Sequence, residues 1–179
     1  MPKNALDNPL VLPLLGLLVE RPRHAYALFS ELRQRYDYLR VRNATVYTLL
    51  ERLTAEGWIA ATEGDERATL TVTESGVATL ADQVRRQIGT ADPTGGPAFV
   101  TALAYLGILP REEAAELLTR RRKLVAAECR RLERILEDIS GPEVHMIEAH
   151  YLLSRLRHDA GWLDRTARRI RNGDPPWPH

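Results

Sequence analysis

Polar side chains on one face of the segment 43–59 are the part of this sequence best suited to binding chemistry. Read at the helical period, apolar residues recur at intervals of three and four and form a single stripe, at Val46, Leu49, Leu50 and Leu53. The opposite face carries hydroxyl and charged groups, at Thr45, Tyr47, Thr48, Glu51 and Arg52. A helix with small hydrogen-bonding groups on its outer face suits insertion into the major groove of DNA. A solvated amphipathic helix is the alternative for this segment taken alone.

The predicted DNA contacts come from this helix, the basic turn before it and one residue of a later loop. They are Arg40, Arg42, Asn43, Thr45, Tyr47, Thr48, Arg52 and Arg67. The hydroxyls of Thr45 and Tyr47 would bind phosphate oxygens, whereas Thr48 and Arg52 would reach base edges. The arginines outside the helix would bind the phosphate backbone. Because Tyr47 flanks the apolar stripe, packing of its ring into the core is the alternative for that residue.

Residue types that support catalysis or metal binding do not occur elsewhere at a useful spacing. The five histidines form no His-Glu-x-x-His motif, and His145 and His150 do not share one helical face. No Gly-x-Ser-x-Gly motif is present, and the acidic pairs are expected to be solvated helix faces. Cys129 is the single cysteine, which excludes an intramolecular disulfide. We therefore expect a protein that is not an enzyme, with no catalytic residues, no metal and no cofactor.

Composition and charge bound the class of protein. With 44% hydrophobic and 27% charged residues, the 179-residue chain can bury a core and form one domain or two small ones. The net charge of +1 gives no case for nucleic acid, but five arginines occur from Arg33 to Arg52 against two acidic residues. The longest apolar run, Pro9–Val19, is too short to span a bilayer, and no cleavage site follows it. We expect a cytoplasmic protein without membrane contact.

Three helices are predicted in the first 57 residues. Asn8 and Pro9 are expected to start the first helix, and the second covers His24–Tyr36. A basic turn then leads into the third helix. Asn43 is expected to cap that helix, and Gly57 to end it in the left-handed conformation.

The sequence then changes to a strand pattern. The stretches 58–62 and 68–73 are rich in β-branched and apolar residues and flank a turn, which predicts a β-hairpin. A further helix is predicted to run to about Ile88. Three helices followed by a hairpin are typical of a winged helix-turn-helix.

The first half of the chain resembles the PadR-like transcriptional regulators in three segments. These are LLGLLVERPRHAYALFSEL (14–32), NATVYTLLERLTAEGWI (43–59) and ERATLTVTESG (66–76). They are similar to the family's LGLL-x-HGYEL, GTLYPxLxRLExEGLI and RxxYxLTExG patterns, in the same order. Differences occur at Ala25 and Ala44, where the family usually has glycine, at Thr48, where it has proline, and at Leu70, where it has tyrosine. The predicted wing tip is acidic at Asp65 and Glu66, which would oppose phosphate binding.

The second half is predicted to be helical, after a glycine-rich linker over residues 89–97. A short helix (99–106) precedes two long ones, 111–139 and 144–170, and the tail 172–179 is expected to be disordered. Apolar residues recur every seven on the first long helix and at alternating intervals of four and three on the second, which is typical of a coiled coil. We predict that this seam joins two chains, through Leu118, Val125, Leu132, Leu153, Leu156, Leu163, Ala167 and Ile170.

The expected fold is therefore mainly α, with a winged helix-turn-helix over residues 1–88 and a coiled-coil-like dimerisation and effector domain over residues 98–171. The resemblance implies a repressor that responds to a small aromatic effector. The seam predicts a homodimer, and the two-fold symmetry of a homodimer predicts an inverted-repeat operator. Phe99, Tyr151 and Trp162 are candidates to line the effector cavity, because aromatic walls suit planar ligands. Aromatic core packing is the alternative for each of them. The alternative function is a winged-helix module that binds proteins rather than DNA, which the acidic wing and near-neutral charge would favour.

Overall fold

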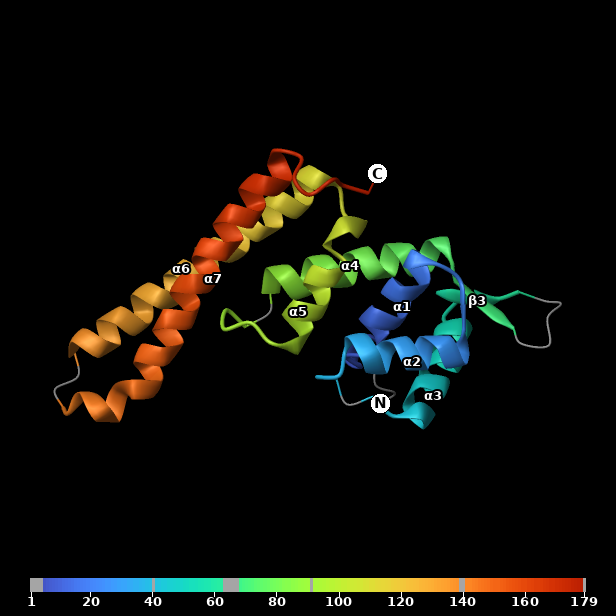
Figure 1. Ribbon diagram of the computed structural model, residues 1–179, viewed down its shortest axis with the longest axis horizontal. Helices are drawn as coiled ribbons and strands as arrows, with labels where there is room; N and C mark the ends of the chain where they lie inside the picture. Colours follow the sequence, from blue (N-terminus) through green and yellow to red (C-terminus); the bar gives the residue numbers. More distant parts are fainter. Residues whose placement is uncertain (1–4, 40, 63–67, 91, 139–140, 179) are drawn as a thin grey trace. The chain divides into compact units, whose positions relative to one another are not determined.

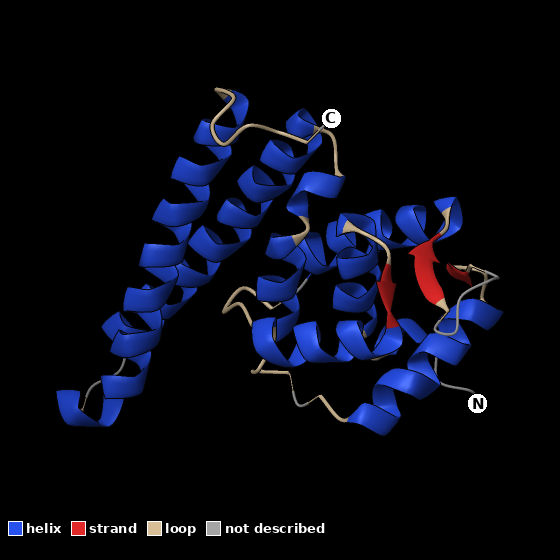
Figure 2. Cartoon of the chain, turned by 45° about the vertical axis from the view of Figure 1, so that its right-hand side comes forward, coloured by secondary structure: helices blue, strands red, loops and turns tan. Residues whose placement is uncertain are grey.

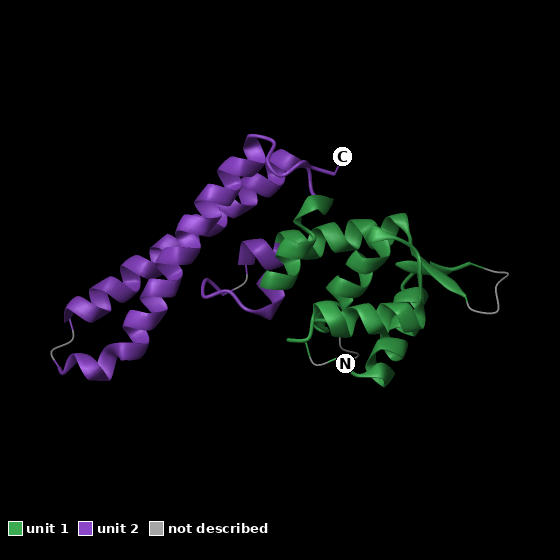
Figure 3. Ribbon diagram, viewed as in Figure 1, with its two compact units in different colours: residues 1–85, 100–108 green, residues 86–99, 109–179 purple. Residues whose placement is uncertain are grey.

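The computed structural model describes residues 5–39, 41–62, 68–90, 92–138 and 141–178. Two compact units make up the chain (Figure 3). Unit 1 contains residues 1–85 and 100–108, and unit 2 contains residues 86–99 and 109–179. The chain therefore leaves unit 1 after Arg85 and returns to it at Val100.

Unit 1 is a set of short helices beside a small sheet (Figures 1 and 2). Its helices are η1 (Ala5–Asp7), α1 (Val11–Glu20), α2 (Ala25–Arg35), α3 (Asn43–Ala55) and the first part of α4 (Glu74–Thr90). Its strands are β1 (Arg23–His24), β2 (Ile59–Ala61) and β3 (Thr69–Val72). Strand order is β1-β3-β2 and both pairs are antiparallel. The predicted winged helix-turn-helix is confirmed, with a third strand added to the hairpin.

The starts of two helices differ from the sequence prediction. Asn43 is the first residue of α3 rather than its cap, because Arg42 has the extended backbone of an N-cap residue, at φ −112° and ψ 139°. The first helix begins at Val11, and Asn8 instead closes a turn in which its side-chain oxygen accepts the Leu10 N–H at 3.0 Å. Gly57 ends α3 as predicted, with φ +74°. The N–H of Trp58 then bonds to the Leu53 carbonyl at 2.9 Å.

Strand β1 was not predicted, and it contains His24, the residue at which the second helix was expected to start. Arg23 pairs with Leu70 and His24 with Thr69, so that the segment between α1 and α2 joins the wing. A two-residue strand is too short to show an alternating pattern in the sequence. Helix α2 therefore starts at Ala25 rather than His24.

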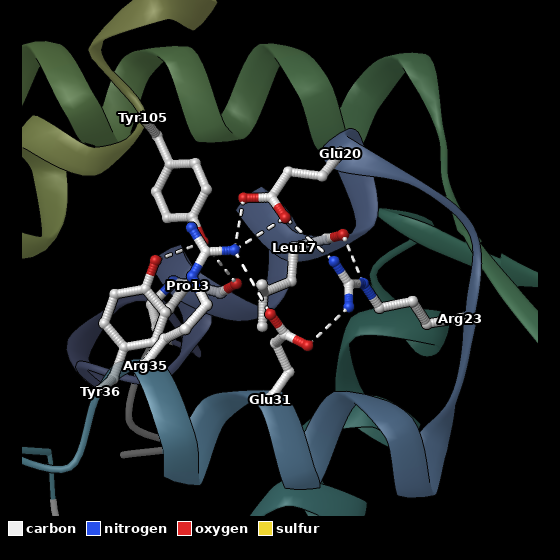
Figure 4. A network of polar contacts seen from close by, with 8 residues as sticks. All are labelled: Pro13, Leu17, Glu20, Arg23, Glu31, Arg35, Tyr36 and Tyr105. Atoms are coloured by element: carbon white, nitrogen blue, oxygen red, sulfur yellow. Dashed lines mark hydrogen bonds and ion pairs between the residues drawn. The ribbon is translucent and has the colours of Figure 1, made fainter.

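A buried arginine ties β1 to the helices around it (Figure 4). Arg23 is only 7% exposed. Its guanidinium donates to the Leu17 carbonyl at 3.2 Å, to Glu20 at 3.0 Å and to Glu31 at 3.1 Å. Arg35 adds two bonds to Glu20, each of 2.8 Å. Because an unpaired charge in this position would be costly, the end of α1, strand β1 and helix α2 are held in one arrangement.

Residues 100–108 complete unit 1. They belong to α5 (Pro97–Ala104) and η2 (Leu106–Ile108), which the chain reaches only after its passage through unit 2. Tyr105, between these two helices, is 6% exposed and lies against Gly16 of α1. A Cβ atom at Gly16 would lie 2.3 Å from the tyrosine ring, so only glycine allows this approach. Burial raises the pKa of the Tyr105 hydroxyl above its ordinary value.

Unit 2 is dominated by two long helices packed along each other, α6 (Arg111–Asp138) and α7 (Ile147–Arg171). A 3-10 turn, η3 (Glu143–Met146), precedes α7, so the last helix starts three residues later than predicted. The apolar seam residues are buried within the single chain: Leu118, Val125, Leu132, Leu153, Leu156, Leu163, Ala167 and Ile170.

The seam residues are buried without a second chain, contrary to the prediction that they join two chains. A heptad pattern shows that a stripe needs a partner helix, but it does not show which helix is the partner. Here α6 and α7 cover each other, so a second chain is not required to bury these residues.

The C-terminal segment also differs from the expected disordered tail. The indole N–H of Trp177 donates to the Leu109 carbonyl at 2.8 Å, which fixes the tail to the start of α6. No helix among the described residues is long and apolar enough to cross a membrane.

Replacing Leu156 with Asp distinguishes a seam inside one chain from a seam between chains. Leu156 is fully buried, so an aspartate there should destabilise the α6–α7 pair by several kcal/mol. Urea unfolding followed by far-UV circular dichroism measures this loss. His158→Asp, at an exposed position on the same helix, is the matched control and should unfold like the wild type. A Leu156→Asp chain that keeps its stability but sediments as a smaller species would show that the seam lies between chains.

Candidate nucleic-acid interface

Helix α3 has one buried face and one exposed face, as its periodicity predicts. Its apolar stripe is buried at Val46, Leu49, Leu50 and Leu53. Arg42, Asn43, Ala44, Tyr47 and Thr48 are exposed, whereas Thr45 and Arg52 are half-buried. The polar side chains of the N-terminal half of α3 are therefore presented together on the surface of unit 1.

A groove along one side of α3 collects its small polar residues. Thr45, Thr48 and Arg52 line it, and Asp7 to Pro9 form the opposite wall. The residues on α3 are spaced by three and four, so that they lie in one row along the helix. This groove brings together three of the predicted DNA contacts, with an arginine at the far end of the row from the helix N-terminus.

A second groove, on the other side of α3, is more apolar and contains two tyrosines. Tyr47 and Glu51 line it from α3, and His24 and Tyr26 line it from β1 and the start of α2. Ala68 and Leu70, at the base of the wing, complete it. Tyr47 is 43% exposed, so its ring borders the groove and does not enter the core. The inward alternative for Tyr47 is therefore wrong.

The basic residues predicted on either side of the helix are only partly described. Arg42 is exposed at the N-cap position of α3, beside the first free N–H groups of the helix. This combination of a cation and unpaired donors favours an anion such as phosphate. Arg40 and Arg67 lie outside the described residues, as does the tip of the wing at residues 63–67.

Two residues in the second groove were missed by the sequence interpretation. Tyr26 is 73% exposed and points its aromatic side chain to the same groove as Tyr47. The imidazole Nδ1 of His24 lies 3.3 Å from the Ala68 carbonyl, and so connects β1 to the start of β3. The helical period of α2 shows only that Tyr26 lies outside the apolar stripe. The pairing of His24 with the wing has no local sequence signal.

The arrangement supports binding rather than catalysis. In the part of the chain that the structure describes, no group of three or more histidine, cysteine or acidic residues could hold a metal ion. The polar groups on α3 and at its N-cap are hydroxyls, an amide, the guanidinium groups of Arg42 and Arg52, and the carboxylate of Glu51. All of these except the carboxylate can bind phosphates, and hydroxyl, amide and guanidinium groups also bind base edges.

The comparison with known families agrees with this geometry. Residues 14–82 match the transcriptional regulator PadR-like family, a stretch that runs from α1 into α4. It includes the whole of α3 and all residues that line the second groove, but not the wall of the first groove at Asp7 to Pro9. Members of this family are transcriptional regulators, not enzymes. No curated protein sequence matches the chain.

Several solved PadR structures resemble the whole chain weakly. The Bacillus subtilis PadR complex with operator DNA is 23% identical, with a TM-score of 0.41, and covers 90% of this chain and 98% of its own. The Bacillus subtilis PadR complex with p-coumaric acid is also 23% identical, with a TM-score of 0.43, and covers 94% and 98%. The PadR-like regulator BC1756 from Bacillus cereus is 12% identical, with a TM-score of 0.41, and covers 92% and 99%.

The three aromatic residues predicted to line an effector cavity do not form one cluster of rings within the described residues. Phe99 is half-buried beneath the Arg121 guanidinium, whose central carbon lies 4.2 Å from the ring centre. Tyr151 is 65% exposed and Trp162 is 38% exposed. Their assignment to an effector site stays a prediction.

Replacing Arg42 with Ala tests the predicted phosphate contact at the start of α3. Binding to any duplex DNA should weaken, and the slope of log affinity against log salt concentration should fall by about one, because one fewer counterion is released. Fluorescence anisotropy with a labelled duplex at several salt concentrations measures both effects. Arg130→Ala, at an exposed position on α6, is the matched control for the loss of one positive charge. Equal slopes for Arg42→Ala and the wild type would remove Arg42 from the interface.

Proposed function

We propose that this protein is a sequence-specific DNA-binding transcriptional repressor. The carrying observation is the exposed polar face of α3 inside a segment that matches the PadR-like family. The exposed Arg42 and the two grooves beside α3 agree with a helix that enters the major groove. The protein would act where the DNA is, and we therefore place it in the cytoplasm.

Each part of the site has a distinct role in this proposal. Thr48 and Arg52 would contact base edges in the major groove, where guanidinium groups recognise guanine. Asn43, Thr45 and Tyr47 would bind phosphate oxygens beside it and fix the register of the helix. Arg42 in the turn, with Arg40 and Arg67, would neutralise phosphates without reading sequence.

We further propose that two copies bind an inverted repeat. The α6–α7 seam does not support this proposal, because each of these helices covers the apolar stripe of the other. The proposal is supported by apolar side chains that are exposed on unit 2, at Leu124, Val144, Ile147 and Tyr151. Ile147 and Tyr151 are four residues apart, so they share one face of α7. In a two-fold dimer, identical recognition helices meet half-sites about 34–36 Å apart, or a multiple of that distance.

A small aromatic molecule is the proposed effector. Bacillus subtilis PadR has been crystallised with p-coumaric acid, and unit 2 of this chain exposes Tyr151 and Trp162. Aromatic side chains suit the faces of planar ligands.

Selection of duplexes from random-sequence DNA tests the DNA-binding function. A repressor of this type should enrich an inverted repeat, bind it much more tightly than a scrambled duplex, and lose affinity steeply as salt rises. Sedimentation of the complex should give two chains for each duplex. Enrichment of no sequence, with affinity that does not change with salt, would favour the winged-helix protein-interaction module instead. A single half-site bound by one chain would contradict the dimer.

The effector proposal is tested with a panel of phenolic acids and larger planar aromatics. An active compound should quench tryptophan fluorescence and release the selected duplex over the same concentration range, because both report one binding event. Trp162→Phe separates the signal of this residue from the signals of Trp58 and Trp177, and the quenching should largely disappear in this variant. Release without loss of quenching in Trp162→Phe would place the ligand elsewhere. No effect of any compound on either signal would contradict ligand control.

A further inference from the structure

The turn between α2 and α3 is held by residues that follow it by more than sixty positions in the sequence. Tyr36 is the C-cap residue of α2, and Tyr38 lies in the turn that leads to α3. Both hydroxyls bond to the segment of residues 100–108, which belongs to the same compact unit. We call these contacts the turn clamp: Tyr36 with Tyr105, and Tyr38 with Thr101.

The first half of the turn clamp is buried. The Tyr36 hydroxyl donates to the Tyr105 hydroxyl at 2.6 Å, and the Tyr105 hydroxyl lies 3.5 Å from the Pro13 carbonyl (Figure 4). Tyr36 is 3% exposed. The Tyr105 ring packs directly against Gly16, where the side chain of any larger residue at position 16 would occupy the space of the ring. A hydroxyl buried in this way is costly to leave without its partner, so the contact fixes Tyr36 relative to α1.

The second half of the turn clamp joins a buried residue to a partly exposed one. The Tyr38 and Thr101 hydroxyl oxygens are 2.9 Å apart, and Thr101 is only 2% exposed. The rings of Tyr36 and Tyr38 also meet edge to face, with centroids 6.1 Å apart. The two hydroxyl contacts and the ring contact make one connected set.

We propose that Thr101 and Tyr105 are positioning residues for the recognition helix, which act by fixing the turn before α3. The proposal rests on the DNA-binding function proposed above. Arg42 and Asn43 follow Tyr38 by only four and five residues, so the position of Tyr38 determines how the N-terminus of α3 is presented. Neither Thr101 nor Tyr105 lines the grooves beside α3, so neither is proposed to touch DNA.

This role has a consequence that simple core packing does not share. Contacts to base edges require the helix to be placed to within about 0.5 Å, whereas attraction to phosphates depends on charge and tolerates displacement. Loss of the turn clamp should therefore reduce affinity for the selected duplex and leave affinity for a scrambled duplex unchanged. A residue that only stabilises unit 1 would change the folded fraction and affect both duplexes equally.

Tyr38→Phe and Thr101→Val remove the same hydrogen bond from its two sides, in the full-length chain. Each should weaken binding to the selected inverted repeat by about fivefold to tenfold, the usual effect of one hydrogen bond. The scrambled duplex and the salt slope should not change. The double variant should be no weaker than either single variant, because the two share one interaction. Thr166→Val, at a half-buried position on α7, is the matched control and should bind like the wild type.

Tyr105→Phe tests the buried half of the turn clamp, together with a measurement that does not require DNA. The Leu39 N–H bonds to the Tyr36 carbonyl at 2.9 Å, so its hydrogen exchange reports the order of the turn. In Tyr105→Phe and in Tyr38→Phe, exchange at Leu39 should become faster while exchange within α1 stays as in the wild type.

The outcomes separate the turn clamp from the proposed function. If the wild type does not distinguish the selected duplex from the scrambled one, the DNA-binding function fails. If the wild type does distinguish them but all clamp variants bind both duplexes as the wild type does, the turn clamp has no positioning role. Equal losses on both duplexes, or faster exchange throughout α1, would reduce Thr101 and Tyr105 to residues that only stabilise the core, and would overturn the proposal.

Discussion

The structure of unit 1 depends on neutralising one buried positive charge. Arg23 is held by the Leu17 carbonyl and by two carboxylates, Glu20 and Glu31, and these partners come from α1 and α2. A guanidinium in this position is stabilised only if its partners stay in place, because a buried charge that loses them is strongly unfavourable. The same residue forms β1 and pairs with Leu70 of the wing. The placement of the wing relative to α1 and α2 therefore follows from where Arg23 finds its acceptors.

The two units are stabilised in different ways. Unit 1 combines an apolar core with buried polar contacts at Arg23 and Tyr105, which have strict geometric requirements. Unit 2 relies on the long apolar seam between α6 and α7, with a second buried arginine, Arg121, at one place on α6. Arg121 donates to the Ile88 carbonyl at the end of α4 and to the Asp92 carbonyl, and burial lowers its pKa. In each unit, a buried arginine therefore donates hydrogen bonds to backbone carbonyls near or just after the C-terminal end of a helix.

Local features of the fold were predictable, whereas features that depend on distant partners were not. The buried stripe of α3 and the left-handed Gly57 follow from periodicity and backbone preference within a few residues. Strand β1 depends on a partner at Leu70, and the burial of Tyr105 depends on a glycine at position 16. Neither relation leaves a mark in the neighbouring sequence. The α6–α7 seam shows the difference well, since the pattern identified the residues that are buried but assigned them to the wrong partner helix. At the candidate interface, the outward orientation of Tyr47 and Thr48 could be read from the period. The grooves beside them, with Asp7 on one side and Tyr26 on the other, required the tertiary structure.

The return of the chain to unit 1 at Val100 has a consequence for how the protein folds during synthesis. The ribosome releases the N-terminal elements first, and domains tend to fold as units when their residues have emerged. For unit 1 this point is reached only after Ile108, because Tyr105 must still fill the slot at Gly16. Until then, α1 and α2 expose an apolar surface and an unpartnered Tyr36 hydroxyl. Contacts between residues so far apart also lengthen the search for the native arrangement, because closing a longer loop costs more entropy. Unit 1, which carries α3, is therefore completed by residues 100–108, which are synthesised after the first residues of unit 2. A nascent chain that stops between Arg85 and Val100 holds an unfinished unit.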